Sequence, residues 1–348
     1  MSFDRRQILQ LLGMSAMSLS VFKPSMLTGS TNASSIKPAR LKPGDTIGLV
    51  SPSGITRSHD KLKIIEEVLD ALDLKIKVDK RAMDRHGYLA GTDNDRAAAI
   101  NDAFADPEID AILTFIGGWG CARLLPMLDY SMIQKNPKII MGFSDITALL
   151  IAIYARTGLT TFHGPSGRSA WNTFTVDYVK RLLFEAEAIK YENPNDTGDN
   201  LTQVRDRIQT ITPGKVQGKL VGGNLTVLSA IIGSQYLPDW NGHILFLEDV
   251  GEGVYRIDRM MTQLKLAGVL DNISGFVFGK CSDCEPDSGY SSFTLEEVLA
   301  HHIKPLGIPA YQGAMIGHIS DKFTIPLGVS AELDANEGTI ALLEAAVK

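Results

Sequence analysis

The sequence predicts an α/β protein with a parallel-sheet domain in its N-terminal part and a smaller, mixed α/β domain in its C-terminal part. Three observations lead to this expectation. Short apolar runs alternate with helix-like segments four times between residues 46 and 155. A polar stretch follows from residue 166 to 214, and a second apolar unit begins after it. Strands that alternate with helices are typical of a parallel sheet, because each helical crossover returns the chain to the end of the sheet where the previous strand began.

The N-terminal domain is expected over residues 36–165. Its predicted strands are 46–51, 74–78, 110–116 and 138–142, and its predicted helices are 59–72, 93–104, 122–128 and 145–155. Helix 59–72 has Leu62, Ile65 and Leu69 on one face, which is the spacing of an amphipathic helix. Asp93 or Asn94 is a suitable N-cap for the next helix. We expect the parallel sheet of this domain to be flavodoxin-like.

The second part of the chain divides into a linker over residues 166–214, with one helix, and a C-terminal domain over residues 215–348. The predicted strands are 215–220, 243–248 and 275–279, with two short strands around a turn within 324–343, and the predicted helices are 176–187, 225–232, 254–267 and 295–302. Strands and helices alternate less regularly here, which favours a mixed sheet.

Composition excludes several classes of protein. The chain has 348 residues, 44% of them hydrophobic and 21% charged, with a net charge of −6. These values are ordinary for a globular protein, and no basic cluster indicates a nucleic-acid partner. Three cysteines are too few for a disulfide framework. Cys281 and Cys284 are either an incidental pair or one local disulfide; no second pair accompanies them, so we expect no metal site. Cys121 is expected in the core.

The first 35 residues are typical of an export signal. Arg5 and Arg6 precede an uncharged, apolar stretch over residues 8–22, which is too short to span a bilayer comfortably as a helix. A charged start, a short apolar core and a small polar tail make a signal peptide, and paired arginines indicate the twin-arginine export machinery. The alternative is a chance dibasic pair before an N-terminal helix. We expect a periplasmic protein, membrane-anchored if the leader stays uncleaved.

Ser144 lies where a buried strand becomes a helix, in the segment Gly142-Phe143-Ser144-Asp145. Ligands of open parallel sheets bind at the carboxyl ends of the strands, where helix N-termini also point their amides. A serine at such a turn has the arrangement of a nucleophile elbow, although Ile146 stands where the usual motif has a second glycine. The alternative is that Ser144 or Asp145 only caps the helix.

A nucleophilic serine needs a base and a group that orients the base. His163 ends a predicted strand, and His318 follows Gly317 in a loop, so both are candidates for the base. Glu248 ends the strand His-Ile-Leu-Phe-Leu-Glu and is the best-placed acid, while Asp249 or Glu252 could instead cap the next helix. Composition does not choose between these residues.

Two glycine-rich loops follow predicted strands, over residues 116–120 and 222–224. Glycines let backbone amides approach a ligand closely, so either loop could contribute to an oxyanion hole or to a phosphate cradle. The cradle has little support, because neither the P-loop lysine nor the dinucleotide-binding glycine spacing is present.

Taken together, these motifs resemble one family. They are Leu41-Lys42-Pro43-Gly44-Asp45, Ser51-Pro52-Ser53-Gly54, Gly117-Gly118-Trp119-Gly120 with Arg123-Leu124-Leu125-Pro126, Gly142-Phe143-Ser144-Asp145, Gly222-Gly223-Asn224-Leu225, Leu247-Glu248-Asp249, Tyr255-Arg256-Ile257-Asp258-Arg259 and Gly317-His318. In this order they resemble the LD-carboxypeptidase family of serine peptidases, which also contains the microcin C immunity peptidases. The resemblance runs from about Leu41 to the C-terminus.

The resemblance implies a catalytic triad of Ser144 as nucleophile, His318 as general base and Glu248 as the residue that orients the base. It implies an oxyanion hole made by the backbone amides of Gly118 and Asp145, a site between the two domains, and a homodimer. It also implies that neither a metal nor an organic cofactor takes part.

The expected function is a serine carboxypeptidase that hydrolyses the LD-amide bond of murein tetrapeptides and releases terminal D-alanine during peptidoglycan turnover. One alternative is a microcin C-type immunity peptidase that cleaves a peptidyl-nucleotide amide, with Trp119 or Trp171 stacking on the base. Another is a non-catalytic periplasmic binding protein. The chain departs from many members at Ile116, where they have an arginine, and at Trp119, where a tyrosine is common. If that arginine holds substrate carboxylates, other groups must do so here, and Arg256 and Arg259 are candidates by charge.

Overall fold

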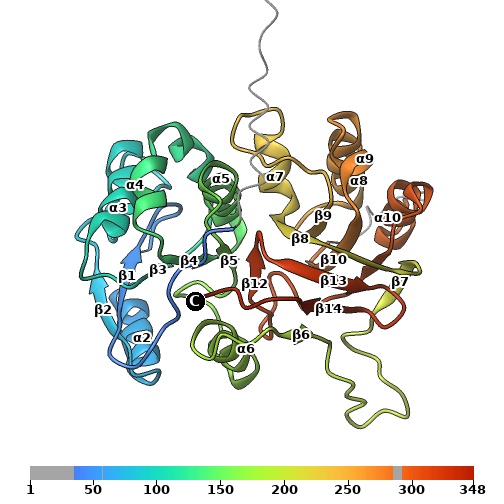
Figure 1. The fold of residues 1–348 in the computed structure, drawn as a ribbon, viewed down its shortest axis with the longest axis horizontal. Coiled ribbons are helices and arrows are strands. Elements are labelled where there is room, and N and C mark those ends of the chain that lie inside the picture. Colours follow the sequence, from blue (N-terminus) through green and yellow to red (C-terminus); the bar gives the residue numbers. More distant parts are fainter. Residues whose placement is uncertain (1–34, 57, 285–291) are drawn as a thin grey trace, which may run out of the picture. The chain divides into compact units, whose positions relative to one another are not determined.

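The fold consists of two β-sheets with helices packed against them (Figure 1). The structure is a computed structural model that describes residues 35–56, 58–284 and 292–348. The predicted signal peptide therefore lies outside the described residues, apart from its last residue. Among the described residues, no helix is both long enough and apolar enough to cross a membrane.

The first sheet is the predicted parallel sheet. Its strands are β1 (Thr46–Val50), β2 (Lys75–Val78), β3 (Ala111–Thr114), β4 (Ile139–Gly142) and β5 (Thr161–His163), all paired in parallel, and β12 (Ile325–Leu327), which pairs antiparallel with β5. The order β12-β5-β4-β3-β1-β2 contains the flavodoxin-like order 2-1-3-4-5. The strand direction thus places the ends of β1, β3 and β4 at one edge, where ligands bind in such sheets.

Helices cover both faces of this sheet (Figure 1). They are α2 (His59–Asp70), α3 (Asp93–Ala105), the 3₁₀ segment η1 (Cys121–Met127), α4 (Tyr130–Lys135), the 3₁₀ segment η2 (Ser144–Ile146), α5 (Thr147–Thr157) and α6 (Thr173–Leu183). In the figure α3, α4 and α5 lie on one face and α2 on the other. Helix α5 is buried over almost its whole length, which explains its nearly uniform apolar sequence.

The second sheet is mixed, as the sequence predicts. Its strands are β6 (Lys190–Tyr191), β7 (Gln209–Thr212), β8 (Lys215–Asn224), β9 (His243–Val250), β10 (Gly275–Ser282), β11 (Ala310–Gln312), β13 (Ser330–Asp334) and β14 (Thr339–Leu342), in the order β6-β14-β13-β8-β9-β10-β11-β7. The strands β8 to β11 pair in parallel, and the flanking pairs are antiparallel. Its helices are α7 (Leu225–Ile231), α8 (Val254–Leu266), α9 (Val269–Asn272), α10 (Leu295–Ile303) and the 3₁₀ segment η3 (Lys304–Leu306).

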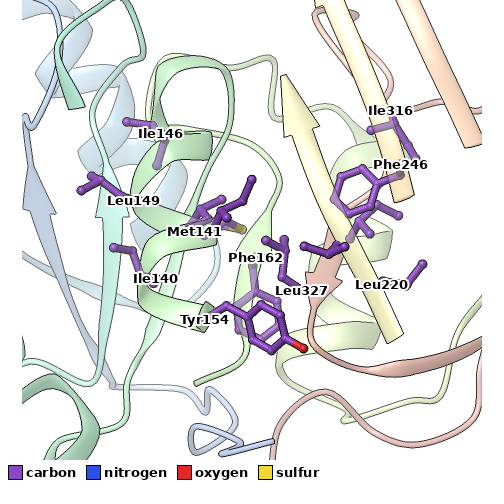
Figure 2. Packing of buried hydrophobic residues seen from close by; sticks show 14 of the residues in the cluster. Ile140, Met141, Ile146, Leu149, Tyr154, Phe162, Leu220, Phe246, Ile316 and Leu327 are labelled. Carbon is purple, nitrogen blue, oxygen red and sulfur yellow. The ribbon is translucent and has the colours of Figure 1, made fainter. Parts of the chain in front are cut away.

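One hydrophobic cluster joins the two sheets. Figure 2 shows Phe162 of β5 and Leu327 of β12 between Tyr154 of α5 and Phe246 of β9. A hydrogen bond crosses the same junction, where the Asn224 amide donates to the Thr147 hydroxyl at 3.0 Å. Residues at the ends of β4, β5 and β9 therefore lie in one continuous packed structure.

Two pairings were not expected from the sequence. The segment predicted as a linker contributes β6 and β7 to the second sheet, and β12, which follows the second group of strands, joins the first sheet. Both strands of the linker and β12 are four residues or shorter, so they carry too little periodicity to be recognised. Cys281 and Cys284 form a disulfide, which is one of the two alternatives left open for them.

Candidate active site

Ser144 occupies a strained backbone position. Strand β4 ends at Gly142, and Ser144 has φ of 64°, a left-handed conformation that residues other than glycine seldom adopt. Gly142 is required before it, because a Cβ there would lie 2.2 Å from the Thr114 Oγ1. Such strain persists only where the surrounding structure fixes it, and it concentrates at functional sites.

The glycine loop after β3 packs directly on Ser144. A Cβ at Gly117 would lie 2.8 Å from the Ser144 Cβ and 3.0 Å from its Oγ, so only glycine fits there. On the other side of this loop, the Gly54 amide donates to the Gly117 carbonyl at 3.2 Å. Gly118 has φ of 131°, and a Cβ there would come within 3.0 Å of Gly54. The ends of β1, β3 and β4 thus meet at the serine.

The Asp145 side chain holds these loops together. Its Oδ2 accepts hydrogen bonds from the Ser53 hydroxyl at 2.5 Å and from the Cys121 amide at 2.9 Å. Cys121 is fully buried, in line with the core position expected for it. The roles expected for Asp145 are those of its backbone amide and of a helix cap, and no sequence pattern indicates this bracing contact.

Glu248 and His318 form a hydrogen-bonded pair. The Glu248 Oε2 and the His318 Nδ1 are 2.7 Å apart, and the glutamate is fully buried. A Cβ at Gly317 would lie 3.2 Å from the same Oε2, so the glycine lets the histidine loop approach the carboxylate. The Oε1 atom has no hydrogen-bond partner among the described residues.

The loop that carries His318 is tied to the disulfide. Ser282, between Cys281 and Cys284, donates its hydroxyl to the His318 carbonyl at 2.9 Å. The Ser282 carbonyl in turn accepts from the Gly251 amide at 2.8 Å, three residues after Glu248. Among the described residues, no group of three potential metal ligands is close enough to hold an ion.

Phe143 brings the two halves of the site together. Its ring centroid lies 4.8 Å from that of His318, and its backbone leads directly into Ser144. The structure therefore packs the glycine loop against Ser144 and pairs Glu248 of β9 with His318, and Phe143 connects these two groups. His318 lies in the loop that leads from β11 of the second sheet to β12 of the first.

His163, the other candidate base, lies in the same region but is enclosed. Its side chain is buried, its Nδ1 has no hydrogen-bond partner among the described residues, and its ring packs against Phe246 with centroids 5.5 Å apart. Burial lowers the pKa of His163 to about 4, although the Glu248 charge acts in the opposite direction. The imidazole is therefore neutral at pH 7.

Lys322 is a site residue that the sequence analysis missed. It is 4% exposed, and its Nζ lies 4.1 Å from the centroid of the Phe143 ring. Burial lowers the pKa of Lys322 to about 8, while the charge of Glu248 acts to raise it. A lysine in a polar loop is usually exposed to solvent, so its residue type did not suggest a buried position. Its place four residues after His318 is the one sequence feature that could have drawn attention to it.

The acids beside Glu248 have structural partners. Asp249 accepts from the Asn224 side chain at 3.0 Å and from the Thr226 hydroxyl at 2.8 Å, which anchors the start of α7. Burial raises the pKa of Asp249 to about 6. Arg256 lies 3.6 Å from Glu252, so this arginine has a carboxylate partner just before the start of α8.

A pocket of about 560 Å³ opens beside the glycine loop. It is lined by Ile55, Thr56, Ser58, Lys61, Gly87, Tyr88 and Arg168. The Arg168 amide donates to the Phe115 carbonyl at 3.1 Å, so the loop that carries this arginine lies beside Ile116. Trp119 is 54% exposed, and its ring contacts Tyr88 with centroids 5.8 Å apart.

Comparisons with known proteins agree on one family. The family model for the LD-carboxypeptidase N-terminal domain matches residues 47–164, and that for the C-terminal domain matches residues 217–333. The chain is 37% identical over 316 residues to a probable murein peptide carboxypeptidase of Bacillus subtilis, covering 89% of this chain and 95% of the relative. It is 30% identical to the murein tetrapeptide carboxypeptidase of Pseudomonas aeruginosa, covering 83% and 93%.

Solved structures show the same similarity. The microcin C7 self-immunity protein MccF, bound to aspartyl sulfamoyl adenosine, matches with a TM-score of 0.80 and 31% identity over 90% of this chain and all of that one. The Escherichia coli protein of that name is 34% identical over 333 residues, covering 88% of this chain and 95% of the relative. The muramoyltetrapeptide carboxypeptidase of Oxalobacter formigenes matches with a TM-score of 0.72 and 28% identity, covering 85% and 97%.

Proposed function

Since this chain belongs to the LD-carboxypeptidase family and is a serine peptidase, we propose that it hydrolyses the amide bond before the terminal D-alanine of murein tetrapeptides. The observation that supports the proposal is the Glu248–His318 hydrogen bond, with the His318 ring in contact with Phe143, the residue before a serine on a strained turn. Relatives named as murein peptide and murein tetrapeptide carboxypeptidases support the substrate class.

In the proposed mechanism Ser144 attacks the amide carbonyl, and His318 accepts the serine proton and passes it to the leaving amine. Glu248 accepts a hydrogen bond from the His318 Nδ1, which fixes the tautomer with Nε2 free for the serine and favours the imidazolium that forms. Water then hydrolyses the acyl-enzyme by the same route.

The oxyanion would be stabilised by the backbone amides of Gly118 and Asp145. The close contact of Gly117 with Ser144, and the bracing of both loops by the Asp145 carboxylate, hold these amides near the nucleophile. One such donor contributes roughly 3–4 kcal/mol to transition-state stabilisation in comparable sites.

A microcin C-type immunity peptidase is the second candidate function, and the exposed Trp119 favours it. An indole ring that is half exposed beside the glycine loop could stack on a nucleobase, whereas Trp171 donates to the Ser166 carbonyl and packs against the core. MccF itself, whose structure matches this chain, has been solved with aspartyl sulfamoyl adenosine and with glutamyl sulfamoyl guanosine.

A comparison of two substrates tests this proposal. The full-length protein is incubated with a disaccharide-tetrapeptide that ends in D-alanine, and separately with an aspartyl sulfamoyl adenosine. We expect release of D-alanine and slow or absent cleavage of the nucleotide amide. Preference for the nucleotide amide would favour the immunity peptidase, and binding of either compound without turnover would favour a non-catalytic binding protein.

We also propose export through the twin-arginine machinery, on the evidence of Arg5, Arg6 and the uncharged stretch after them. Periplasmic location would bring the enzyme to wall-derived peptides. Fractionation of cells that express the full chain tests this, and replacement of both arginines by lysine should keep the protein in the cytoplasm. The homodimer expected from the family resemblance is tested by light scattering of the purified protein.

A further inference from the structure

A carboxypeptidase must recognise the free carboxylate of its substrate. In a peptide that ends in an amino acid, this carboxylate is attached to the same Cα as the scissile nitrogen. The cation that binds it must therefore lie close to the nucleophile. The relevant cations of the candidate site are therefore those beside Ser144.

Lys322 is the cation that the structure places there. Its Nζ lies over the ring of Phe143, the residue before Ser144, and the His318 ring contacts the same phenyl group. Lys322 is 4% exposed, and its ammonium has three donors. Among the described residues its Nζ has no hydrogen-bond or ion-pair partner, and it packs over the Phe143 ring.

The surrounding structure holds this lysine in place. The Thr175 hydroxyl accepts from the Lys322 amide at 3.3 Å and donates to the Ser320 carbonyl at 3.2 Å. The Asn172 side chain, the N-cap of α6, donates to Asp321 at 2.6 Å. The loop between His318 and Lys322 is thus fixed to α6, and the ammonium is oriented before any ligand arrives. A buried charge without a partner is costly, which indicates that its partner is the ligand.

Other cations near the site are engaged or lie elsewhere. Arg256 has Glu252 as a partner, and Arg123 pairs with Asp93 at 2.6 Å. Lys61 and Arg168 line a pocket whose lining residues do not include Phe143, Ser144 or His318. Glu248, which attracts the ammonium, directs its Oε2 to His318.

We propose that the Lys322 ammonium binds the free carboxylate of the terminal residue and so makes this serine peptidase a carboxypeptidase. The inference rests on the proposed function and deepens it, because it names the group of the substrate that the site reads. The ammonium would donate one N–H to each oxygen of the substrate carboxylate, which would then be the partner that Lys322 lacks in the free protein. A charged hydrogen bond of this kind is shorter and stronger than a neutral one.

The test compares two tetrapeptide substrates that differ only at the end, one with a terminal carboxylate and one with a terminal carboxamide. Full-length wild-type protein should prefer the carboxylate by roughly 10- to 100-fold in kcat/KM, the range of a hydrogen bond to a charged group. Lys322→Met should lose much more activity on the carboxylate substrate than on the carboxamide, so that the preference for the carboxylate disappears. Lys322→Arg should regain part of the preference.

Lys138→Met is the matched control. Lys138 is a half-buried lysine that precedes β4, at the opposite end of the strand from Ser144, and it donates to the Ala103 carbonyl at 3.0 Å. This variant should retain the full preference for the carboxylate.

Three results would overturn the inference. Equal losses on both substrates in Lys322→Met would show that the lysine acts through Glu248 or the fold. Equal rates of the wild type on the two substrates would show that the site does not recognise the carboxylate, without contradicting the proposed peptidase activity. Hydrolysis of neither substrate by the wild type would refute the proposed function itself.

Discussion

Glu248 carries a carboxylate with no solvent exposure, and His318 is its hydrogen-bond partner. In Glu248→Gln the amide is nearly isosteric, but it can no longer stabilise the imidazolium, and it can present its NH₂ group to the histidine and select the wrong tautomer. We expect kcat to fall by roughly 10⁴-fold, as when the acid of a Ser-His-Asp site is neutralised. Steady-state kinetics check this, with thermal unfolding as the control for folding. A loss below tenfold would contradict the role given to Glu248.

The charged Lys322 side chain should lower the free energy of unfolding of the protein at neutral pH. Its pKa is lowered from 10.5 to about 8, chiefly by burial, so the folded state disfavours the charged form. The charged or titratable groups that face it are Glu248, which acts to raise the pKa, and the histidines His163 and His318. Between pH 8 and 10.5 the unfolded chain binds more protons at this residue, so wild-type stability rises with pH in that window.

Lys322→Met should therefore unfold at higher urea concentration than the wild type at pH 7. The difference of 10.5 and about 8 corresponds to about 3 kcal/mol, an upper estimate for the gain. The gain should shrink as the pH is raised towards 10.5. Urea unfolding at pH 7 and pH 9.5 measures it, and a variant that is less stable at pH 7 by a similar amount would contradict the burial argument.

At the scale of elements, the turns around Ser144 are fixed by glycines. In Gly117→Ala the new Cβ would meet the serine at 2.8 Å, so the nucleophile or the loop must move. We expect kcat to fall at least 100-fold, since misplacement by about 1 Å has this effect. Gly158→Ala is the comparison: its φ of 75° makes the substitution strained, but no atom lies within 4 Å, so it should cost about 1 kcal/mol of stability and leave kcat unchanged. Equal kcat values in the two variants would argue against the close contact.

The disulfide should stabilise the element that carries His318. The loop closed by Cys281 and Cys284 is short, so the chain-entropy relation gives about 2 kcal/mol. The double variant Cys281→Ser/Cys284→Ser should melt at a lower temperature and lose several-fold in kcat, because Ser282 then holds the His318 carbonyl less firmly. A reductant should reproduce both effects in the wild type and change nothing in the variant. A wild-type melting temperature that is insensitive to dithiothreitol would contradict this prediction.

Sequence patterns predicted the long elements well for a physical reason. Strands β1, β3 and β4 are buried on both faces and read as continuous apolar runs, and α8 has a clear helical periodicity. The bracing contacts of Asp145 and the burial of Lys322 could not be predicted, because they join loops that are distant in sequence. Their residue types are those of ordinary caps and surface loops, so nothing local distinguishes them.

At the scale of the whole molecule, the candidate site exists only while the two sheets stay together. Ser144 follows β4 of the first sheet, Glu248 lies in β9 of the second, and His318 lies in the loop that leads from the second sheet back to the first. Gly223 of β8 packs on Thr147 of α5 at the junction of the two sheets. A Cβ at Gly223 would lie 2.5 Å from the Thr147 Oγ1. Gly223→Ala should thus reduce kcat more than Gly158→Ala does while the secondary structure stays intact, which kinetics and circular dichroism would show. Wild-type kcat in this variant would mean that the junction tolerates displacement.

The family resemblance identified the general base, which the sequence pattern alone left open. The sequence pattern favours His163 and His318 equally as bases, and it does not indicate that His318 contacts Phe143 and Glu248, which are distant in sequence. The resemblance selected His318, and in the structure His318 has the carboxylate partner while His163 is enclosed and neutral.

The role of Ser144 is tested by the release of free D-alanine from a disaccharide-tetrapeptide, measured for the wild type and for Ser144→Ala. We expect release by the wild type and a loss of at least 10⁴-fold in the variant, with unchanged melting temperature, since loss of the nucleophile in serine peptidases has an effect of this size or larger. Release at the wild-type rate by folded Ser144→Ala would contradict the assignment of Ser144 as the nucleophile.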